Sequence, residues 1–434
     1  MAMLSFQKKL TKPFFIVLSL PATAMGFALS VQIAALSWIL NTKFGFNLEE
    51  IGYVWIAGPA AGILGQVIVG LISDKVWFWG GRRRPFILVG GTIAALMLLA
   101  LPNIDIIGKA LGIEEMIGVA IAVALSLDLA INISFNPTRS VIADVTPRGD
   151  VRTKGYTWMQ TISGFFGVVA YLIGAFVSNY ILIYLGAGLV FLFSIIPTFF
   201  IEEPQKLIPE DEVIETNNTG KKTNSLAFLK ICIAHAFTWV GVQTMFIYTF
   251  SYIKENIMGF ATLDQLTDAQ NNEIGFITGV SFAVLNTVGF LLPSLVLEPL
   301  SKRIGRVKTH MLCIAIMAMG YFLIVMFGHT QAALFGFMVV LGIGWAAVVS
   351  LPFAIMSETV DQNKMGLYMG LFNLSVVLPQ LVASYLGGFI DQSENKNVIF
   401  IISAICLGIS AALWLLVKDQ TTEASLQNEV ETAH

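Results

Sequence analysis

The chain has 434 residues, of which 56% are hydrophobic and only 12% are charged. Soluble domains average about 25% charged residues, so this sequence has too few charges to cover a water-exposed surface of its size. We therefore expect most of the surface to face lipid. The net charge of −3 gives no indication of a nucleic-acid partner.

Twelve apolar segments are long enough to span a membrane, since a helix needs about 20 apolar residues to cross the hydrocarbon core. Three lysines precede the first segment, which continues past Ile39 without the small-residue cleavage pattern of a signal peptide, so we interpret it as a retained helix. The twelve segments are residues 13–40, 50–73, 86–103, 115–138, 155–178, 180–201, 226–250, 273–297, 308–328, 331–354, 366–390 and 397–417.

The longest polar stretch between segments runs from Glu202 to Ser225 and separates the sixth from the seventh. We therefore predict an all-α membrane protein with twelve transmembrane helices in two pseudo-symmetric six-helix bundles. The predicted parts are an N-terminal bundle (1–201), a cytoplasmic linker (202–225), a C-terminal bundle (226–418) and a polar cytoplasmic tail (419–434).

The distribution of lysine and arginine indicates how the chain is oriented, because these residues concentrate in short cytoplasmic loops. With both termini in the cytoplasm, 21 of the 25 basic residues lie on that side. The four that remain outside are Lys43, Lys109, Lys254 and Lys396. We predict this orientation for the chain.

Asp128 is the one carboxylate that the sequence places near the middle of a segment, between Gly118 and Arg139. A charge at the bilayer centre costs about 2.5–3.5 kcal/mol on insertion scales, and a carboxyl group away from water retains its proton more readily. We therefore predict that Asp128 binds substrate and exchanges a proton. The alternative is a structural aspartate bonded to neighbouring hydroxyls and amides.

Polar side chains elsewhere in the segments are candidates for the same substrate site. Amides donate and accept hydrogen bonds with a hydroxylated ligand, and an indole offers an apolar face to a sugar ring. For each amide taken alone, a hydrogen bond between helices is the more common role. The candidates are Gln32, Gln66, Asn132, Gln160, Trp239, Gln243, Asn373 and Gln380.

Charged residues at the predicted cytoplasmic ends of the segments form a second group. Opposite charges at helix ends can hold one side of a bundle closed in one state and separate in another. The alternative is that these charges only set the topology. The predicted cytoplasmic gate consists of Asp74, Arg82, Arg83, Arg84, Arg139, Asp144, Glu298, Arg306 and Glu358.

The sequence contains no constellation that indicates an enzyme. It has no phosphate-binding loop of the form GxxxxGK(S/T), its four histidines are scattered, and its three cysteines have no metal or disulfide spacing. We predict no cofactor and no metal. Any energy for transport must then come from an ion gradient or from the gradient of the substrate itself.

Several motifs, found in both halves, resemble one transporter family. The stretch from Gly58 to Asp74 has the form GPxxGxxxQxxxGxxSD and is followed by GRRRPF. The sequence around Asp128, the GWA motif at Gly344 and the GLFNL motif at Gly370 show the same similarity. Together they resemble the sucrose-transporter branch of the glycoside–pentoside–hexuronide:cation symporters, within the major facilitator superfamily. One departure is Ser30, where relatives place Gln or Glu.

The resemblance implies proton-coupled uptake of a disaccharide such as maltose or sucrose by alternating access, with Asp128 matching the family's mid-membrane aspartate. The short central linker and tail favour a compact bacterial member in the inner membrane, and we expect it to be a monomer whose partners are sugar, proton and lipid. The alternatives are a sodium-coupled carrier or uniporter, efflux of another small molecule, and a non-transporting membrane sensor.

Overall fold

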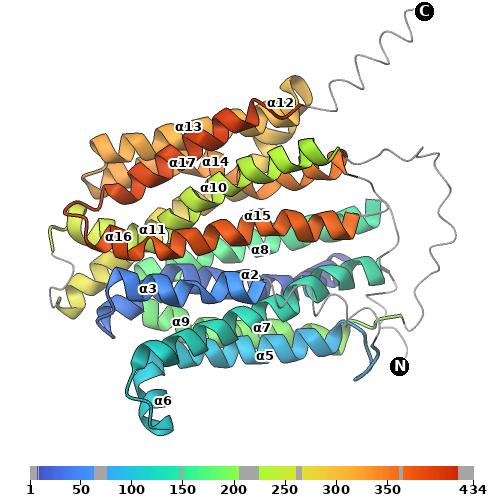
Figure 1. Ribbon diagram of the computed structural model, residues 1–434. Helices are drawn as coiled ribbons and strands as arrows, with labels where there is room; N and C mark the ends of the chain where they lie inside the picture. The colour runs from blue at the N-terminus through green and yellow to red at the C-terminus, as the bar shows by residue number, and fades with distance from the viewer. Residues whose placement is uncertain are drawn as a thin grey trace, which may run out of the picture. The chain divides into compact units, whose positions relative to one another are not determined.

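The computed structural model describes residues 7, 9–62, 76–146, 150–204, 224–260, 266–360 and 365–418 (Figure 1). These residues form helices joined by short turns. The chain divides into two compact units. Unit 1 comprises residues 1–212 and 262–283, and unit 2 comprises residues 213–261 and 284–434. The predicted domain boundary in the linker stays a prediction, because residues 205–223 lie outside the described part of the chain.

Unit 1 contains the helices that begin the chain and the first part of α11. Their order is α2 (Lys12–Thr42), α3 (Leu48–Trp55), α5 (Arg84–Ala100), the short 3₁₀ turn η1 (Leu101–Asn103), α6 (Ile104–Leu111), α7 (Met116–Val145), α8 (Asp150–Phe176), α9 (Asn179–Phe200) and α11 (Asp268–Leu292).

Unit 2 contains the remaining helices and the second part of α11. Their order is α10 (Ser225–Tyr252), the π-helical turn η3 (Ile253–Ile257), the π-helical turn η4 (Pro293–Leu297), α12 (Glu298–Ile304), α13 (Arg306–Phe327), α14 (Gln331–Thr359), α15 (Met365–Tyr385), α16 (Gly387–Asp391) and α17 (Val398–Trp414).

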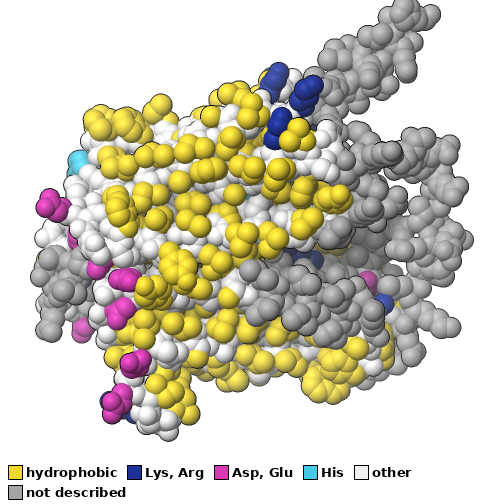
Figure 2. Space-filling view, in the orientation of Figure 1, with side chains coloured by type: hydrophobic (Ala, Val, Ile, Leu, Met, Phe, Trp, Pro, Cys, Tyr) yellow, Lys and Arg dark blue, Asp and Glu magenta, His cyan; other side chains and the backbone are white. Residues whose placement is uncertain are grey.

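Among the described residues, ten helices are long and apolar enough to cross a membrane, and α17 is a shorter apolar helix. These eleven coincide with eleven of the twelve predicted segments. The remaining segment, 50–73, is helical as far as residue 62 apart from a turn at Ile56, and beyond that it lies outside the described residues. Figure 2 shows hydrophobic side chains covering the sides of the helices, as a lipid-facing surface requires.

Small residues allow the helices of each unit to approach closely, as is common in membranes. A Cβ atom added at Gly90 of α5 would lie 2.1 Å from Ser134 Oγ of α7, and one at Gly91 would lie 2.1 Å from Ser194 Oγ of α9. In unit 2, Ser403 Oγ of α17 donates to the carbonyl of Gly241 in α10 at 2.8 Å. These approaches fix how α5 and α10 pack, and they hold the polar residues described below at defined positions.

Candidate functional site

The carboxyl group of Asp128 lies on α7 beside the first membrane helix. Gln32 of α2 donates a hydrogen bond from Nε2 to Asp128 Oδ2 at 3.0 Å. Both side chains are buried, with exposed fractions of 5% for Asp128 and 2% for Gln32. Within the described part of the chain, Asp128 forms no ion pair with a lysine or arginine. The amide of Gln32 is therefore the contact that positions this carboxyl group.

Gly58 leaves space on a second side of the same carboxyl group. A Cβ atom at this position would lie 3.4 Å from Asp128 Oδ2 and 3.6 Å from Oδ1. Gly58 lies in the helical stretch 57–62, two residues after Ile56, the C-cap of α3. Because glycine has no side chain, only backbone lies against the Asp128 carboxyl at this position.

The other predicted site residues of unit 1 are not all brought to Asp128. Asn132 donates from Nδ2 to the backbone carbonyl of Asp128 at 2.8 Å, one turn along the same helix. Gln160 is exposed on α8. Gln66 lies outside the described residues. In the described part of unit 1, Gln32 and Gly58 lie against the carboxyl group, and Asn132 bonds to the backbone of Asp128.

In unit 2, α10 carries a row of polar and aromatic side chains. The indole Nε1 of Trp239 donates to His235 Nε2 at 2.9 Å, and the imidazole of His235 stacks on Phe372 with ring centroids 4.9 Å apart. One turn further along, Gln380 of α15 donates from Nε2 to Gln243 Oε1 at 3.2 Å. Two predicted residues on different helices, Gln243 and Gln380, are thus joined directly.

Two residues that the sequence analysis left out of the site extend this row. Trp345 of α14 donates from Nε1 to Asn286 Oδ1 of α11 at 3.2 Å, and its ring lies 6.2 Å from that of Trp239. Asn286 could have been recognised from the sequence, because it is an amide within the apolar run of α11. Asn373 of α15 is half-buried. Unit 2 therefore presents amides and indoles together, as a hydroxylated ligand requires.

The basic stretch before α5 folds into a tight turn. The backbones of Phe78 and Gly81 exchange two hydrogen bonds, and both residues between them have positive φ, +50° at Trp79 and +77° at Gly80. Two positive φ values in succession define a turn that glycine favours at one or both positions. The turn directs the backbone N–H groups of the three following arginines to one side.

Glu203 accepts hydrogen bonds from all three of these N–H groups. Its Oε2 lies 2.8 Å from the nitrogens of Arg82 and Arg83, and its Oε1 lies 2.7 Å from the nitrogen of Arg84. A carboxylate is favoured here because α5 begins at Arg84 and a helix N-terminus carries partial positive charge. A Cβ at Gly81 would lie 2.6 Å from Glu203 Oε1, so a side chain here would displace the carboxylate from its present position. The sequence analysis missed Glu203, which is separated from the arginines by about 120 residues.

Two of these arginine side chains lie against Asp144, whereas Arg139 lies against an aromatic ring. Arg83 Nε donates to Asp144 Oδ2 at 3.1 Å, and Arg82 Nη2 lies 3.9 Å from the same oxygen. The guanidinium of Arg139 lies over the ring of Phe135, with Cζ 4.2 Å from its centroid, and forms no ion pair within the described part of the chain. Asp74 lies outside the described residues. Of the predicted gate in unit 1, the structure joins Arg82, Arg83 and Asp144.

In unit 2, Glu298 pairs with its own helix. Lys302 Nζ lies 2.7 Å from Glu298 Oε1, one turn along α12. This hydrogen bond holds the pKa of the Glu298 carboxyl below its ordinary value. Arg306 begins α13 after the turn at Gly305. The side chain of Glu358, near the end of α14, lies outside the described residues.

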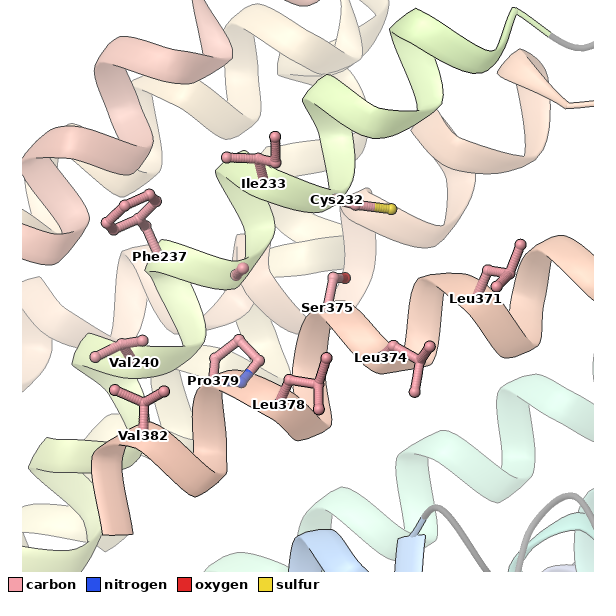
Figure 3. A pocket seen from close by; sticks show the side chains of 11 residues that line it. Cys232, Ile233, Phe237, Val240, Leu371, Leu374, Ser375, Leu378, Pro379 and Val382 are labelled. Carbon is pink, nitrogen blue, oxygen red and sulfur yellow. The ribbon is translucent and has the colours of Figure 1, made fainter. Parts of the chain in front are cut away.

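An apolar groove of about 400 Å³ lies between α10 and α15 (Figure 3). Cys232, Ile233, Ala236, Phe237 and Val240 line it from α10, and the other lining residues belong to α15. Ser375 is the hydroxyl-bearing residue among its eleven lining residues. This groove offers little to a hydroxylated ligand, so the amides and indoles of unit 2 are the better candidate.

The comparisons with known proteins agree with this architecture. The chain matches the sequence model of the Major Facilitator Superfamily over residues 18–378 and 261–433. It is 25% identical to "Sucrose transport protein SUT5" of Oryza sativa subsp. indica over 478 residues, covering 94% of this chain and 88% of that protein.

One further relative matches a shorter part of the chain, and a solved structure shares its fold. The "General alpha-glucoside permease" of Schizosaccharomyces pombe is 29% identical over 188 residues, covering 40% of this chain and 34% of that one. The crystal structure of the nucleoside transporter NupG superposes with a TM-score of 0.67 at 13% identity, covering 93% of this chain and 98% of that one. At that identity the NupG likeness shows the fold alone.

Proposed function

This chain belongs to the Major Facilitator Superfamily, and from that premise we propose that it is a secondary active transporter that takes up a disaccharide together with a proton. The observation that carries the proposal is the buried carboxyl group of Asp128 within a membrane-spanning helix, held by Gln32 and free of ion pairs within the described residues. Such a group can exist in both protonation states during a transport cycle.

The substrate class is proposed from the relatives and from the side chains. The relatives are named as a sucrose transporter and an α-glucoside permease. Both units offer amides, and unit 2 adds indoles, which suit sugar hydroxyls and ring faces. We assign sugar binding to Asp128, to the amides of both units, and to Trp239. The predicted members are Gln32, Gln66, Asn132, Gln160, Gln243, Asn373 and Gln380.

In this proposal the cycle alternates between outward and inward access, as in other two-bundle carriers. A proton on Asp128 removes its charge when the sugar binds, and release of both substrates to the cytoplasm restores it. The pairing of Arg82 and Arg83 with Asp144 supports a role for these residues in the cytoplasmic gate. We place the protein in the inner membrane as a monomer with both termini in the cytoplasm.

The function is tested with purified protein in liposomes that carry an imposed proton gradient. We expect radiolabelled sucrose or maltose to accumulate inside, and we expect a protonophore to abolish this accumulation. Accumulation that survives the protonophore but requires sodium would refute proton coupling. If neither sugar enters above the rate in protein-free liposomes, the proposed substrate class is wrong.

Gly58→Ala is expected to weaken sugar uptake without unfolding the protein. The added methyl would make ordinary contacts with the Asp128 carboxyl, so the fold can accept it, but it would fill the space in which that group reorients. We expect the apparent KM to rise about tenfold, equivalent to roughly 1.4 kcal/mol. Uptake kinetics measure this effect.

Gly188→Ala is the matched control, because a Cβ at Gly188 of α9 has no atom within 4 Å. It should leave both the KM and the thermal stability unchanged. Unaltered kinetics in Gly58→Ala would show that the space beside Asp128 has no part in transport.

A further inference from the structure

A cavity of about 1020 Å³ lies in unit 2 where α12 meets α13. Four cationic side chains line it: Lys302, Arg303, Arg306 and Lys308. Figure 2 shows Lys and Arg side chains gathered at the α12 end of this unit. The cavity is far larger than the volume of a single water molecule, about 30 Å³. It can therefore admit a sizeable ligand.

The lining of the cavity has a large excess of positive charge. Glu298 is its one carboxylate, so four cations and one anion leave a net charge of +3. Glu298 is already engaged by Lys302 at 2.7 Å. Within the described part of the chain, neither Arg303 nor Lys308 has an ion pair. Two cations are therefore available to an anion that enters.

The backbone at the cavity adds a second feature that favours an anion. Gly305 lines the cavity, has φ +88° and turns the chain from α12 into α13. No side chain caps the N-terminus of α13, a helix of 22 residues, and its first N–H groups carry the positive end of the helix dipole.

A hydroxyl group in the cavity also lacks a partner. Ser301 Oγ is shielded from solvent and makes no hydrogen bond among the described residues. A hydroxyl can donate to a phosphate oxygen. The Ser301 hydroxyl is therefore available, with the cations, to an anion that enters the cavity.

The cavity also has an apolar side. Pro293, Leu297, Ile304 and Leu351 line it beside the charged residues, and α11 ends its membrane span at Leu292. The cavity thus lies just beyond the end of a helix that is long and apolar enough to span a membrane. Basic pockets between helices on the cytoplasmic side suit anionic headgroups.

From these features we infer that the α12–α13 cavity binds a phosphate-bearing anion, supplied by an anionic lipid headgroup or by free phosphate. Arg303 and Lys308 contact the phosphate, Ser301 donates a hydrogen bond, and the N-terminus of α13 points its N–H groups at the anion. This site is independent of the proposed sugar site, because no residue of the Asp128 group or the amide row lines the cavity.

The test uses the purified full-length protein in a neutral detergent and a fluorescent phosphatidylglycerol as the probe. Anisotropy should show saturable binding that unlabelled phosphatidylcholine with the same chains displaces poorly. If inorganic phosphate displaces the probe, free phosphate is sufficient for the site. If it does not, the site requires the lipid. Equal displacement by phosphatidylcholine and phosphatidylglycerol would overturn the inference.

The double variant Arg303→Gln/Lys308→Gln removes the two unpaired cations. We expect the Kd for the probe to rise about 30-fold, since each basic residue near an anionic headgroup contributes about 1 kcal/mol. The control is Lys230→Gln/Lys418→Gln, which removes two charges from unit 2 outside the cavity and should change the Kd less than twofold.

Glu298→Gln provides a change of opposite sign. It removes the carboxylate and releases Lys302, so the probe should bind more tightly. Binding that is unchanged in both the double variant and Glu298→Gln would exclude a site in this cavity. The measurement follows binding of the lipid probe without sugar. Its outcome therefore tests the anion site independently of the proposed transport function.

Discussion

Asp128→Asn is expected to abolish accumulation of sugar against a gradient while leaving exchange of sugar across the membrane intact. Asparagine matches the carboxyl group in shape and can still bond to Gln32, but it cannot release or accept the coupling proton. The ratio of internal to external sugar should fall to about 1, the value that a passive carrier reaches. Liposome uptake with an imposed proton gradient measures the ratio, and counterflow measures exchange.

Asp268→Asn is the matched control, because it makes the same chemical change at an exposed carboxylate on the first residue of α11. It should accumulate sugar like the parent protein. Undiminished accumulation by Asp128→Asn would remove Asp128 from the coupling mechanism and favour the structural role that a buried, amide-bonded aspartate can also have.

Glu203→Ala is expected to destabilise the protein by about 3 kcal/mol. The carboxylate accepts three backbone hydrogen bonds at the start of α5, and bonds to a charged group contribute about 1.5–3 kcal/mol each, of which entering water recovers part. Its removal also leaves the charges of Arg82 and Arg83 with less compensation. The thermal unfolding midpoint of the purified protein should fall by several degrees.

The neighbouring substitution Glu202→Ala is the control. Glu202 contributes its backbone to hydrogen bonds with Gln7, which a change of side chain leaves in place. It should therefore have little effect on the midpoint. Equal stability of the two variants would show that the three contacts to Glu203 do not support the turn before α5.

The sequence predicted the helical membrane fold because the hydrophobic pattern is local. A run of about 20 apolar residues is sufficient to identify a spanning helix, whatever its neighbours are. Asp128 was recognisable for the same reason, since a carboxylate within such a run is unusual by itself. Its role in coupling stays a prediction, as do the roles of the amides.

The pairing of these residues depends on contacts between distant parts of the chain. Gln32 and Asp128 were both named from the sequence, but 96 residues separate them, and only the packing of α2 on α7 joins them. The same holds for Gln243 and Gln380. Side-chain amides have no sequence pattern that specifies a partner.

Charges were the hardest to assign from the sequence. Arg139 was grouped with Asp144, yet its guanidinium lies on Phe135, four residues earlier, while Arg83 takes the carboxylate. Glu203 was absent from the prediction because it follows the sixth membrane segment as an ordinary polar residue. A charged side chain is long and flexible, so its neighbours in space, more than its place in the sequence, determine its partner.

The sequence by itself therefore determined that this protein spans the membrane with many helices and carries a carboxylate within one of them, because burying a charge in lipid is costly wherever it occurs. Only the tertiary structure decided that Gln32 holds Asp128, that Glu203 holds the start of α5, and that four cations of α12 and α13 surround one cavity. Those arrangements arise from close packing between helices, which depends on side chains from distant parts of the chain meeting in three dimensions.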